Sequence, residues 1–219
     1  MQSQKKISMK FIQCVIAALC VSAVTVITGC HHGDPAVPYN YTLIPFENEN
    51  GLFGYMETDG DIVIKPQFEE ASAFSNELAR VKIDGEYGYI NEDGKVVIPA
   101  IYTDGTSFRN NLAFVKAKEN HYICITPEGR MKFEMADCKA IRPFSGNMAA
   151  FCSVLNKWGY VNVSGEIIFI PTFDKASDFH EGVAAVQMHG LWGLVNEKGQ
   201  FVVEPVYKSL GFESFTSNE

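Results

Sequence analysis

The stretch "KWGYVNVSGEIIFIPTF", Lys157 to Phe173, decides the fold of this protein, because a closely similar phrase returns 34 residues later. The second copy reads "LWGLVNEKGQFVVEPVY", Leu191 to Tyr207. Each copy has an aromatic residue beside a glycine, a second glycine six residues after the first, and then an apolar run interrupted by proline. A phrase that returns at a fixed interval indicates repeated structural units that stack on one another.

The same pattern can be followed through most of the chain. The repeat-defining residues are the pairs Phe53-Gly54, Tyr87-Gly88, Trp158-Gly159 and Trp192-Gly193 and the second glycines Gly60, Gly94, Gly129, Gly165 and Gly199. Successive second glycines are 34, 35, 36 and 34 residues apart. The middle copy departs from the pattern, with Ile123 in place of the first glycine and no proline. We interpret it as a drifted copy of a tolerant repeat, with a specialised contact patch as the alternative.

Each position in the phrase predicts local structure. Side chains alternate between the two glycines, which is typical of a half-buried strand. Turns such as "NVSG" have asparagine first and glycine fourth, which favours a type I turn followed by a glycine bulge. The run "EIIFI" that follows is apolar on both parities, so we expect that strand to be covered on both faces. Proline lacks an N–H for the ladder, so we expect it to end the strand.

A block such as "LARV" adds another strand before each aromatic-glycine strand, and "YTLIPF", Tyr41 to Phe46, supplies it for the first copy. The sequence therefore predicts an all-β fold of five tandem three-stranded antiparallel meanders, stacked as an open solenoid or superhelix. A closed propeller-like ring is the alternative, although propeller blades normally have four strands and about 40 to 45 residues. Connectors such as "PTFDKASDF" carry spaced aromatics, which we expect to pack between neighbouring meanders.

These residues show a family resemblance. From about Gly51 to Tyr207 the chain resembles tandem WG repeats, also called KWG repeats, whose hallmark is the phrase quoted above. The resemblance implies a β-rich repeat module, found on many bacterial surface and secreted proteins, with no general enzymatic activity attached.

The first thirty residues indicate targeting rather than fold. Three lysines precede an apolar stretch, residues 11–27, that contains no acidic residue and is short for a membrane span of about 20 residues. It ends in Ile27-Thr28-Gly29-Cys30, which resembles the lipobox of bacterial lipoproteins. That resemblance implies a signal peptide over 1–29, cleavage after Gly29 and lipid attached to Cys30. Residues 30–40 then form the lipidated cysteine and a polar tether, and 41–219 form the repeat domain.

The lipobox also implies a location. A lipid anchor tethers a protein to a bilayer surface without spanning it, so we expect a bacterial cell-envelope protein. His31, rather than aspartate, follows the cysteine, which points to the outer membrane under the sorting rule of some Gram-negative bacteria.

Charge excludes one class of partner. The formal net charge of −8 becomes −11 over 190 residues when 1–29, with three lysines and no acids, is removed. Phosphate binding needs a basic face, so we expect no nucleic-acid partner.

No catalytic, metal or cofactor motif is recognisable. The three histidines of the repeats, His121, His180 and His189, are scattered, and we expect them in solvated loops. Cys124, Cys138 and Cys152 form no zinc-type pair, and we expect buried thiols. The acidic residues near turns are explained by turn chemistry.

The aromatic residues beside glycine have two interpretations, packing between units or a ligand-stacking ladder, and we favour packing. We therefore predict a non-catalytic protein that needs no cofactor or metal. Its predicted function is a lipid-anchored binding scaffold for a protein, peptide or glycan, with unknown ligand-binding residues. A structural spacer or assembly subunit of an envelope complex is the alternative, and a hydrolase a more distant one.

Overall fold

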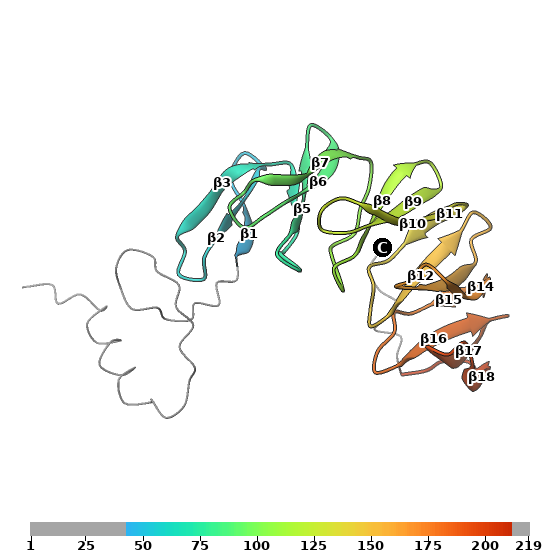
Figure 1. The fold of residues 1–219 in the computed structure, drawn as a ribbon. Coiled ribbons are helices and arrows are strands. Elements are labelled where there is room, and N and C mark those ends of the chain that lie inside the picture. The colour runs from blue at the N-terminus through green and yellow to red at the C-terminus, as the bar shows by residue number, and fades with distance from the viewer. Residues whose placement is uncertain (1–42, 212–219) are drawn as a thin grey trace, which may run out of the picture. The chain divides into compact units, whose positions relative to one another are not determined.

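The computed structural model describes residues 43–211, and these residues contain strands and turns without a helix. Eighteen strands form five separate antiparallel sheets of three or four strands each (Figure 1). The predicted signal peptide over 1–29, the tether over 30–40 and Cys30 lie outside the described residues. Within the described part of the chain, no helix is long and apolar enough to cross a membrane.

Each sheet is one repeat unit, and its strands follow the chain order. Unit 1 consists of β1 (Ile44–Glu47), β2 (Phe53–Met56) and β3 (Ile62–Phe68). Unit 2 consists of β4 (Glu70–Ala71), β5 (Ala79–Ile83), β6 (Glu86–Ile90) and β7 (Val96–Tyr102). Unit 3 consists of β8 (Ala113–Lys118), β9 (His121–Ile125) and β10 (Met131–Met135). Unit 4 consists of β11 (Cys138–Ile141), β12 (Met148–Ser153), β13 (Trp158–Asn162) and β14 (Ile167–Phe173). Unit 5 consists of β15 (Lys175–Ala176), β16 (Val183–Met188), β17 (Leu191–Asn196) and β18 (Phe201–Tyr207).

The predicted five meanders are confirmed, with one addition. In units 2, 4 and 5 the connector supplies a short fourth strand, β4, β11 or β15, that pairs with the first long strand. In unit 3 a single bridge between Gly105 and Val115 takes its place. β4 and β15 have two residues each and leave no side-chain alternation to detect, and the sequence pattern did not reveal the four-residue β11 either.

The turn after each aromatic-glycine strand has the predicted chemistry. In unit 4 the Gly165 N–H donates to the Asn162 carbonyl at 2.9 Å, and Gly165 has a φ of +87°. The Asn162 Oδ1 accepts hydrogen bonds from the N–H groups of Ser164 at 3.0 Å and Glu166 at 2.9 Å. Asparagine thus closes the turn with its side chain, and glycine supplies the left-handed residue.

The expectation that proline ends the apolar strand is wrong, because the strand continues through it. In unit 4, β14 contains Pro171 and pairs with β13 on both sides of it. The register shifts between Trp158↔Phe173 and Tyr160↔Phe169, so the proline segment bulges across Gly159. A Cβ on Gly159 would lie 2.4 Å from the Phe169 carbonyl oxygen, and only glycine leaves room for the bulge.

The same close approach recurs in the other units that keep the pair. Added Cβ atoms would lie 2.5 Å from the Ile64 oxygen at Gly54, 2.7 Å from the Ile98 oxygen at Gly88 and 2.5 Å from the Val203 oxygen at Gly193. Glycine and the proline-bearing bulge are therefore two halves of one feature.

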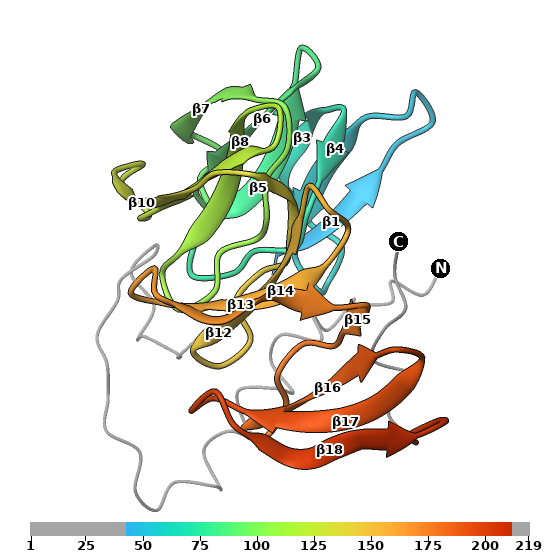
Figure 2. The ribbon, with the colours of Figure 1, turned by 90° about the vertical axis from the view of Figure 1, so that its right-hand side faces the viewer.

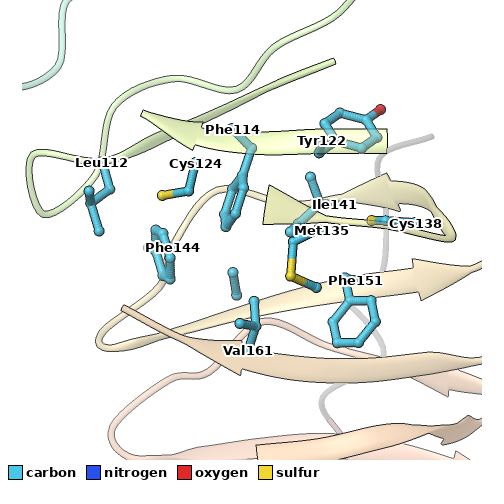
Figure 3. Packing of buried hydrophobic residues seen from close by; sticks show 11 residues of the cluster. Leu112, Phe114, Tyr122, Cys124, Met135, Cys138, Ile141, Phe144, Phe151 and Val161 are labelled. Atoms are coloured by element: carbon cyan, nitrogen blue, oxygen red, sulfur yellow. The ribbon is translucent and has the colours of Figure 1, made fainter. Parts of the chain in front are cut away.

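Hydrophobic side chains gather between units rather than in one central core. Four clusters are present in the described residues, one at each junction of consecutive units. At the junction of units 4 and 5, for example, Tyr160 and Phe173 pack with Val186 and Val195. Figure 3 shows the cluster between units 3 and 4. Each unit thus obtains its hydrophobic cover from its neighbour, as predicted.

The described strands form an open series. β1 pairs only with β2 and β18 only with β17, so no ladder joins the last sheet to the first within residues 43–211. No described cluster contains residues of both unit 1 and unit 5. The open arrangement follows from this pairing.

The last strand of each unit, here called the outer strand, is largely exposed. The outer strands are β3, β7, β10, β14 and β18, and each lies at an edge of its sheet. Twelve of the fifteen exposed large apolar residues lie on them: Ile62, Val63, Val96, Val97, Ile101, Met131, Ile167, Ile170, Phe201, Val202, Val206 and Tyr207. The expectation of a strand covered on both faces is therefore wrong. An edge strand has one neighbour, and the adjacent unit covers only selected side chains, such as Ile64 and Ile98.

Candidate functional site

In units 1, 2 and 4, the tyrosine that follows the first glycine of the repeated phrase joins the unit to the next one. Tyr55, Tyr89 and Tyr160 are fully buried. Their hydroxyl groups donate to the backbone oxygens of Ser72 at 2.8 Å, Thr106 at 2.7 Å and Ser177 at 2.7 Å, each 17 residues further along the chain. Burial raises the pKa of all three tyrosines, which keeps the hydroxyl protonated as a donor.

The closing aromatic of the connector packs on the same tyrosine ring. The ring centroids are 4.8 Å apart for Tyr55 and Phe74, and 4.9 Å for both Tyr89–Phe108 and Tyr160–Phe179. This confirms that the connector aromatics pack between neighbouring units. Sequence reasoning missed the tyrosine itself, although its recurrence directly after glycine in three copies was a visible signal.

The aromatic residues before glycine line a different position. Phe53, Tyr87 and Trp158 are half-buried, and Trp192 is buried. The Arg80 guanidinium lies 4.8 Å from the Tyr87 ring centroid, and the Arg142 guanidinium lies 4.5 Å from the Trp158 ring centroid. A cation at this distance over a ring face is stabilising and occupies the face that a ligand would stack on.

Both arginines also reach the next unit. An Arg80 guanidinium N–H donates to the Gly105 oxygen, and an Arg142 N–H donates to the Ala176 oxygen at 2.9 Å. Arg142 also lies 3.4 Å from the Asp178 carboxylate. These contacts favour packing between units over a ligand-stacking ladder for these rings.

Unit 2 carries the most developed polar cluster beside a ring. Glu70 accepts hydrogen bonds from Lys82 at 2.9 Å and from the Tyr87 hydroxyl at 2.8 Å. The Lys82 hydrogen bond, followed by that of Tyr87, lowers the pKa of Glu70, and the same pairing raises the pKa of Lys82. Glu70 is thus held ionised, which suits a structural ion pair rather than a general acid.

The histidines of the repeats lie at separate places in the described chain. His121 lies in β9, with a side chain 16% exposed, and contacts Glu134 at 3.2 Å. The prediction of a solvated loop is therefore wrong for His121, whereas His189 is exposed in a turn. Within residues 43–211, no group of three or more histidine, cysteine, aspartate or glutamate residues could hold a metal ion.

The three predicted thiols are buried, as expected. Burial raises the pKa of Cys124 and of Cys138 to about 12, and it also raises the pKa of Cys152. In Figure 3, Cys124 and Cys138 lie at different places in the cluster between units 3 and 4. Protonated, buried thiols are poor nucleophiles.

Unit 3 has no tyrosine at the joining position, and a ring from the neighbouring strand takes its place. Cys124 occupies the tyrosine position, and Phe114, its partner on the neighbouring strand β8, supplies the ring instead. The Phe114 ring stacks on Phe144 with centroids 5.0 Å apart (Figure 3). In unit 4 the same two positions hold Ala150 and Tyr160. A small and a large side chain have changed places across the strand pair.

These features define a class of β-repeat protein, and a family model identifies it. The model described as "WG containing repeat" matches residues 53–87, 87–122, 158–192 and 192–218. The chain therefore belongs to the WG-repeat family. The matches leave out 123–157, where unit 3 lacks the glycine and the proline. No curated protein matches the chain.

Solved structures show a similar fold at low identity. Hsv2 of Kluyveromyces lactis is 12% identical with a TM-score of 0.52, over 82% of this chain and 66% of that chain. The computationally designed protein Ika8 is 10% identical with a TM-score of 0.50, over 76% of this chain and 59% of that chain. The WD40 β-propeller domain of Doa1 is 11% identical with a TM-score of 0.39, over 74% of this chain and 63% of that chain. The chain thus spans about 60% of the length of Ika8 and of another structure that it resembles, an Hsv2 with an altered loop.

Proposed function

We propose that this protein is a non-catalytic, lipid-anchored scaffold that binds a protein, peptide or glycan at the bacterial cell envelope. One observation carries the proposal. The apolar side chains that remain exposed are concentrated on the outer strands, with Ile101 65%, Ile170 69% and Val206 62% exposed. Exposed apolar side chains that gather on a surface mark interaction sites, and here they gather on one edge strand of each unit.

The distribution of packing supports the same conclusion. The four hydrophobic clusters serve the junctions between units, and the outer strands give them selected side chains, such as Ile64, Ile98 and Phe173, while their other apolar side chains stay exposed. Prolines such as Pro171 and Pro205 lie on these strands and limit uncontrolled edge pairing. The outer strands can therefore offer apolar side chains to a partner while the repeat array keeps its own stability.

The lipid anchor is the second part of the proposal and rests on the lipobox resemblance. An acyl-modified Cys30 would hold the repeat domain at a membrane surface, in the outer membrane by the sorting argument. Cys30→Ala should abolish incorporation of labelled fatty acid. The variant protein should then be released from the membrane fraction. Unchanged labelling of the variant would contradict the assignment of Cys30.

A pull-down from detergent-solubilised envelope tests the scaffold. The tagged protein should recover a partner that is lost when Ile101 and Ile170 are both changed to aspartate. Leu155→Asp is the matched control, because Leu155 is 79% exposed but lies in the β12–β13 turn, away from the outer strands. Equal loss with Leu155→Asp would contradict an outer-strand site.

The same experiment distinguishes one of the two alternative functions, and the arrangement of the residues bears on the other. A structural spacer or assembly subunit of an envelope complex would be favoured if the unaltered protein recovered no partner from protein or glycan fractions. A hydrolase is disfavoured by the scattered histidines and by acidic residues that serve turns, such as Asp59, whose Oδ1 accepts the Asp61 N–H at 3.2 Å.

A further inference from the structure

The outer strands differ in how well their free edges are protected. The strands β3, β7, β14 and β18 each contain a proline, at positions 66, 99, 171 and 205. Proline and bulges on an edge strand hinder pairing with another chain. The outer strand of unit 3, β10, reads MKFEM and is the one described outer strand without proline.

The pairing of β10 with its neighbour β9 is also more regular than the pairing of the other outer strands. Phe133, Glu134 and Met135 pair consecutively with Cys124, Ile123 and Tyr122. The register shifts once, between Met131 and Phe133, at the end near the turn. The outer strands of the other units carry two shifts each, one of them over the glycine. β10 therefore retains an unbroken edge over its second half.

That edge is open to solvent. β10 is the terminal strand of its sheet (Figure 2), Met131 is 63% exposed and the Glu134 side chain is 63% exposed. The opposite edge of the sheet, β8, is covered by the preceding connector. There the Thr106 N–H donates to the Phe114 oxygen at 2.8 Å and the Lys116 N–H to the Asp104 oxygen at 2.9 Å.

The sequence of β10 indicates which strand pairs with its free edge. We propose that β10 pairs antiparallel with β10 of a second copy of this chain, across a two-fold axis at Phe133. In that register Lys132 of each copy, which lies at the single register shift of β10, is opposite Glu134 of the other copy, and Met131 is opposite Met135. Opposite charges directly across an antiparallel pair are stabilising, and like charges are destabilising. A strand that is its own complement is what a two-fold interface requires.

The side chains needed for this pairing are available. Lys132 and Glu134 are exposed, whereas Phe133 packs against the cluster between units 3 and 4 and Met135 is buried in it. Glu134 already contacts His121 at 3.2 Å, and a carboxylate can accept further hydrogen bonds. The pairing therefore joins two copies without disturbing either core.

The interface is small, so the association is weak. One pair of five-residue strands buries less than the roughly 1,000 Å² of a stable interface. Tethering both copies to one membrane would raise their local concentration and favour the dimer. The β10 pairing itself does not depend on the proposed scaffold function. It would place two sets of outer strands in one assembly.

Charge reversal tests the pairing. Sedimentation equilibrium of the protein as the cell produces it, extracted in a density-matched mild detergent, should show a concentration-dependent dimer. Lys132→Glu or Glu134→Lys alone converts two opposite-charge pairs into like-charge pairs by symmetry, and should weaken the dimerisation constant about tenfold. The double variant Lys132→Glu/Glu134→Lys should restore it. Lys65→Glu, an equivalent reversal on the proline-bearing β3, should leave dimerisation unchanged.

Three results would overturn the proposal. A monomer at every concentration would exclude this occupant, including the case in which β10 accepts a strand from a different protein. A dimer that the single reversals do not weaken, or that the double variant does not restore, would place the interface elsewhere. Circular dichroism of each variant separates loss of pairing from loss of folding, because all three substituted positions are exposed.

Discussion

Units 3 and 4 are neighbours with the same strand order, yet they solve the same packing problem differently. Unit 4 keeps the aromatic, the glycine, the proline and the tyrosine of the repeat, and its outer strand bulges across Gly159. Unit 3 has Ile123 at the glycine position, no proline and no bulge there. The glycine and the bulge are present together or absent together. The bulge is sterically possible only beside glycine, and the glycine is necessary only where the strand bulges.

The second difference concerns the ring at the junction. In unit 4 it is Tyr160 opposite a small Ala150, and in unit 3 it is Phe114 opposite a small Cys124. Both rings reach the closing aromatic of the next connector, at 4.9 Å and 5.0 Å. Unit 3 is therefore a compensated variant of the repeat rather than a loosened one, which refines the interpretation of drift.

The largest effect is expected from breaking the glycine position of unit 4. Gly159→Ala places a Cβ 2.4 Å from the Phe169 oxygen. Since backbone must move, the free energy of unfolding should fall by at least about 3 kcal/mol, measured by urea denaturation. Gly190→Ala is the control, with a φ of +80° but no atom within 4 Å, and should cost only about 1 kcal/mol. Equal losses would show that the bulge does not depend on glycine.

The exchange of large and small side chains can be tested with a double-mutant cycle in unit 3. Phe114→Ala should cost about 3 to 5 kcal/mol by leaving a cavity, and Cys124→Tyr about 1 to 3 kcal/mol by overpacking. The double variant recreates the pair found in unit 4, so its loss of unfolding free energy should be smaller than the sum by at least about 1 kcal/mol. Strictly additive losses would contradict the compensation.

The hydroxyl that unit 3 lacks has a smaller expected effect in unit 4. Tyr160→Phe keeps the ring but leaves the Ser177 oxygen without its donor at 2.7 Å. We expect a loss of about 1 to 2 kcal/mol in unfolding free energy, because the hydrogen bond is buried. Tyr207→Phe, at a position 51% exposed, should change stability by less than about 0.5 kcal/mol. The same loss at both positions would sink the assigned role of the hydroxyl.

Thiol labelling tests whether the cysteines of units 3 and 4 are buried, and it needs no substitution that alters stability. The thiols Cys124, Cys138 and Cys152 should react with iodoacetamide at pH 8 at least about 100-fold more slowly in the native protein than in urea. Their folded pKa values are raised, so the thiolate is scarce at pH 8 and the labelling rate should rise only at higher pH. Peptide mass spectrometry assigns each site. Rapid native labelling of Cys138 would instead indicate an exposed patch near unit 3.

Much of the fold could be predicted because the informative residues act locally. The asparagine and glycine of "NVSG" determine their own turn, and a repeated turn determines a repeated hairpin. The exposure of the outer strands could not be predicted, because an apolar run such as Ile167 to Ile170 is compatible with a buried strand or an edge strand. The joining role of Tyr160 was also missed, since its partner Ser177 lies in the next connector.

The residues of the candidate site, like the fold, were only partly predictable from the sequence. The rings beside glycine were recognisable in the sequence, but the guanidinium groups that cover Tyr87 and Trp158 come from Arg80 on β5 and Arg142 in a connector, at unrelated sequence spacings. Only the folded chain shows that these ring faces are occupied. The opposite charges of Lys132 and Glu134 on either side of Phe133 were in the sequence too, yet they have meaning only for a strand at an open edge.

The sequence by itself determined the number of units, their phase and their turns, because side-chain alternation and turn chemistry depend on neighbours within a few residues. The tertiary structure alone decided which strand is outermost, which glycine faces a backbone bulge and which ring joins one unit to the next. Those choices depend on contacts between residues 10 to 35 positions apart, where packing rather than local propensity determines the result.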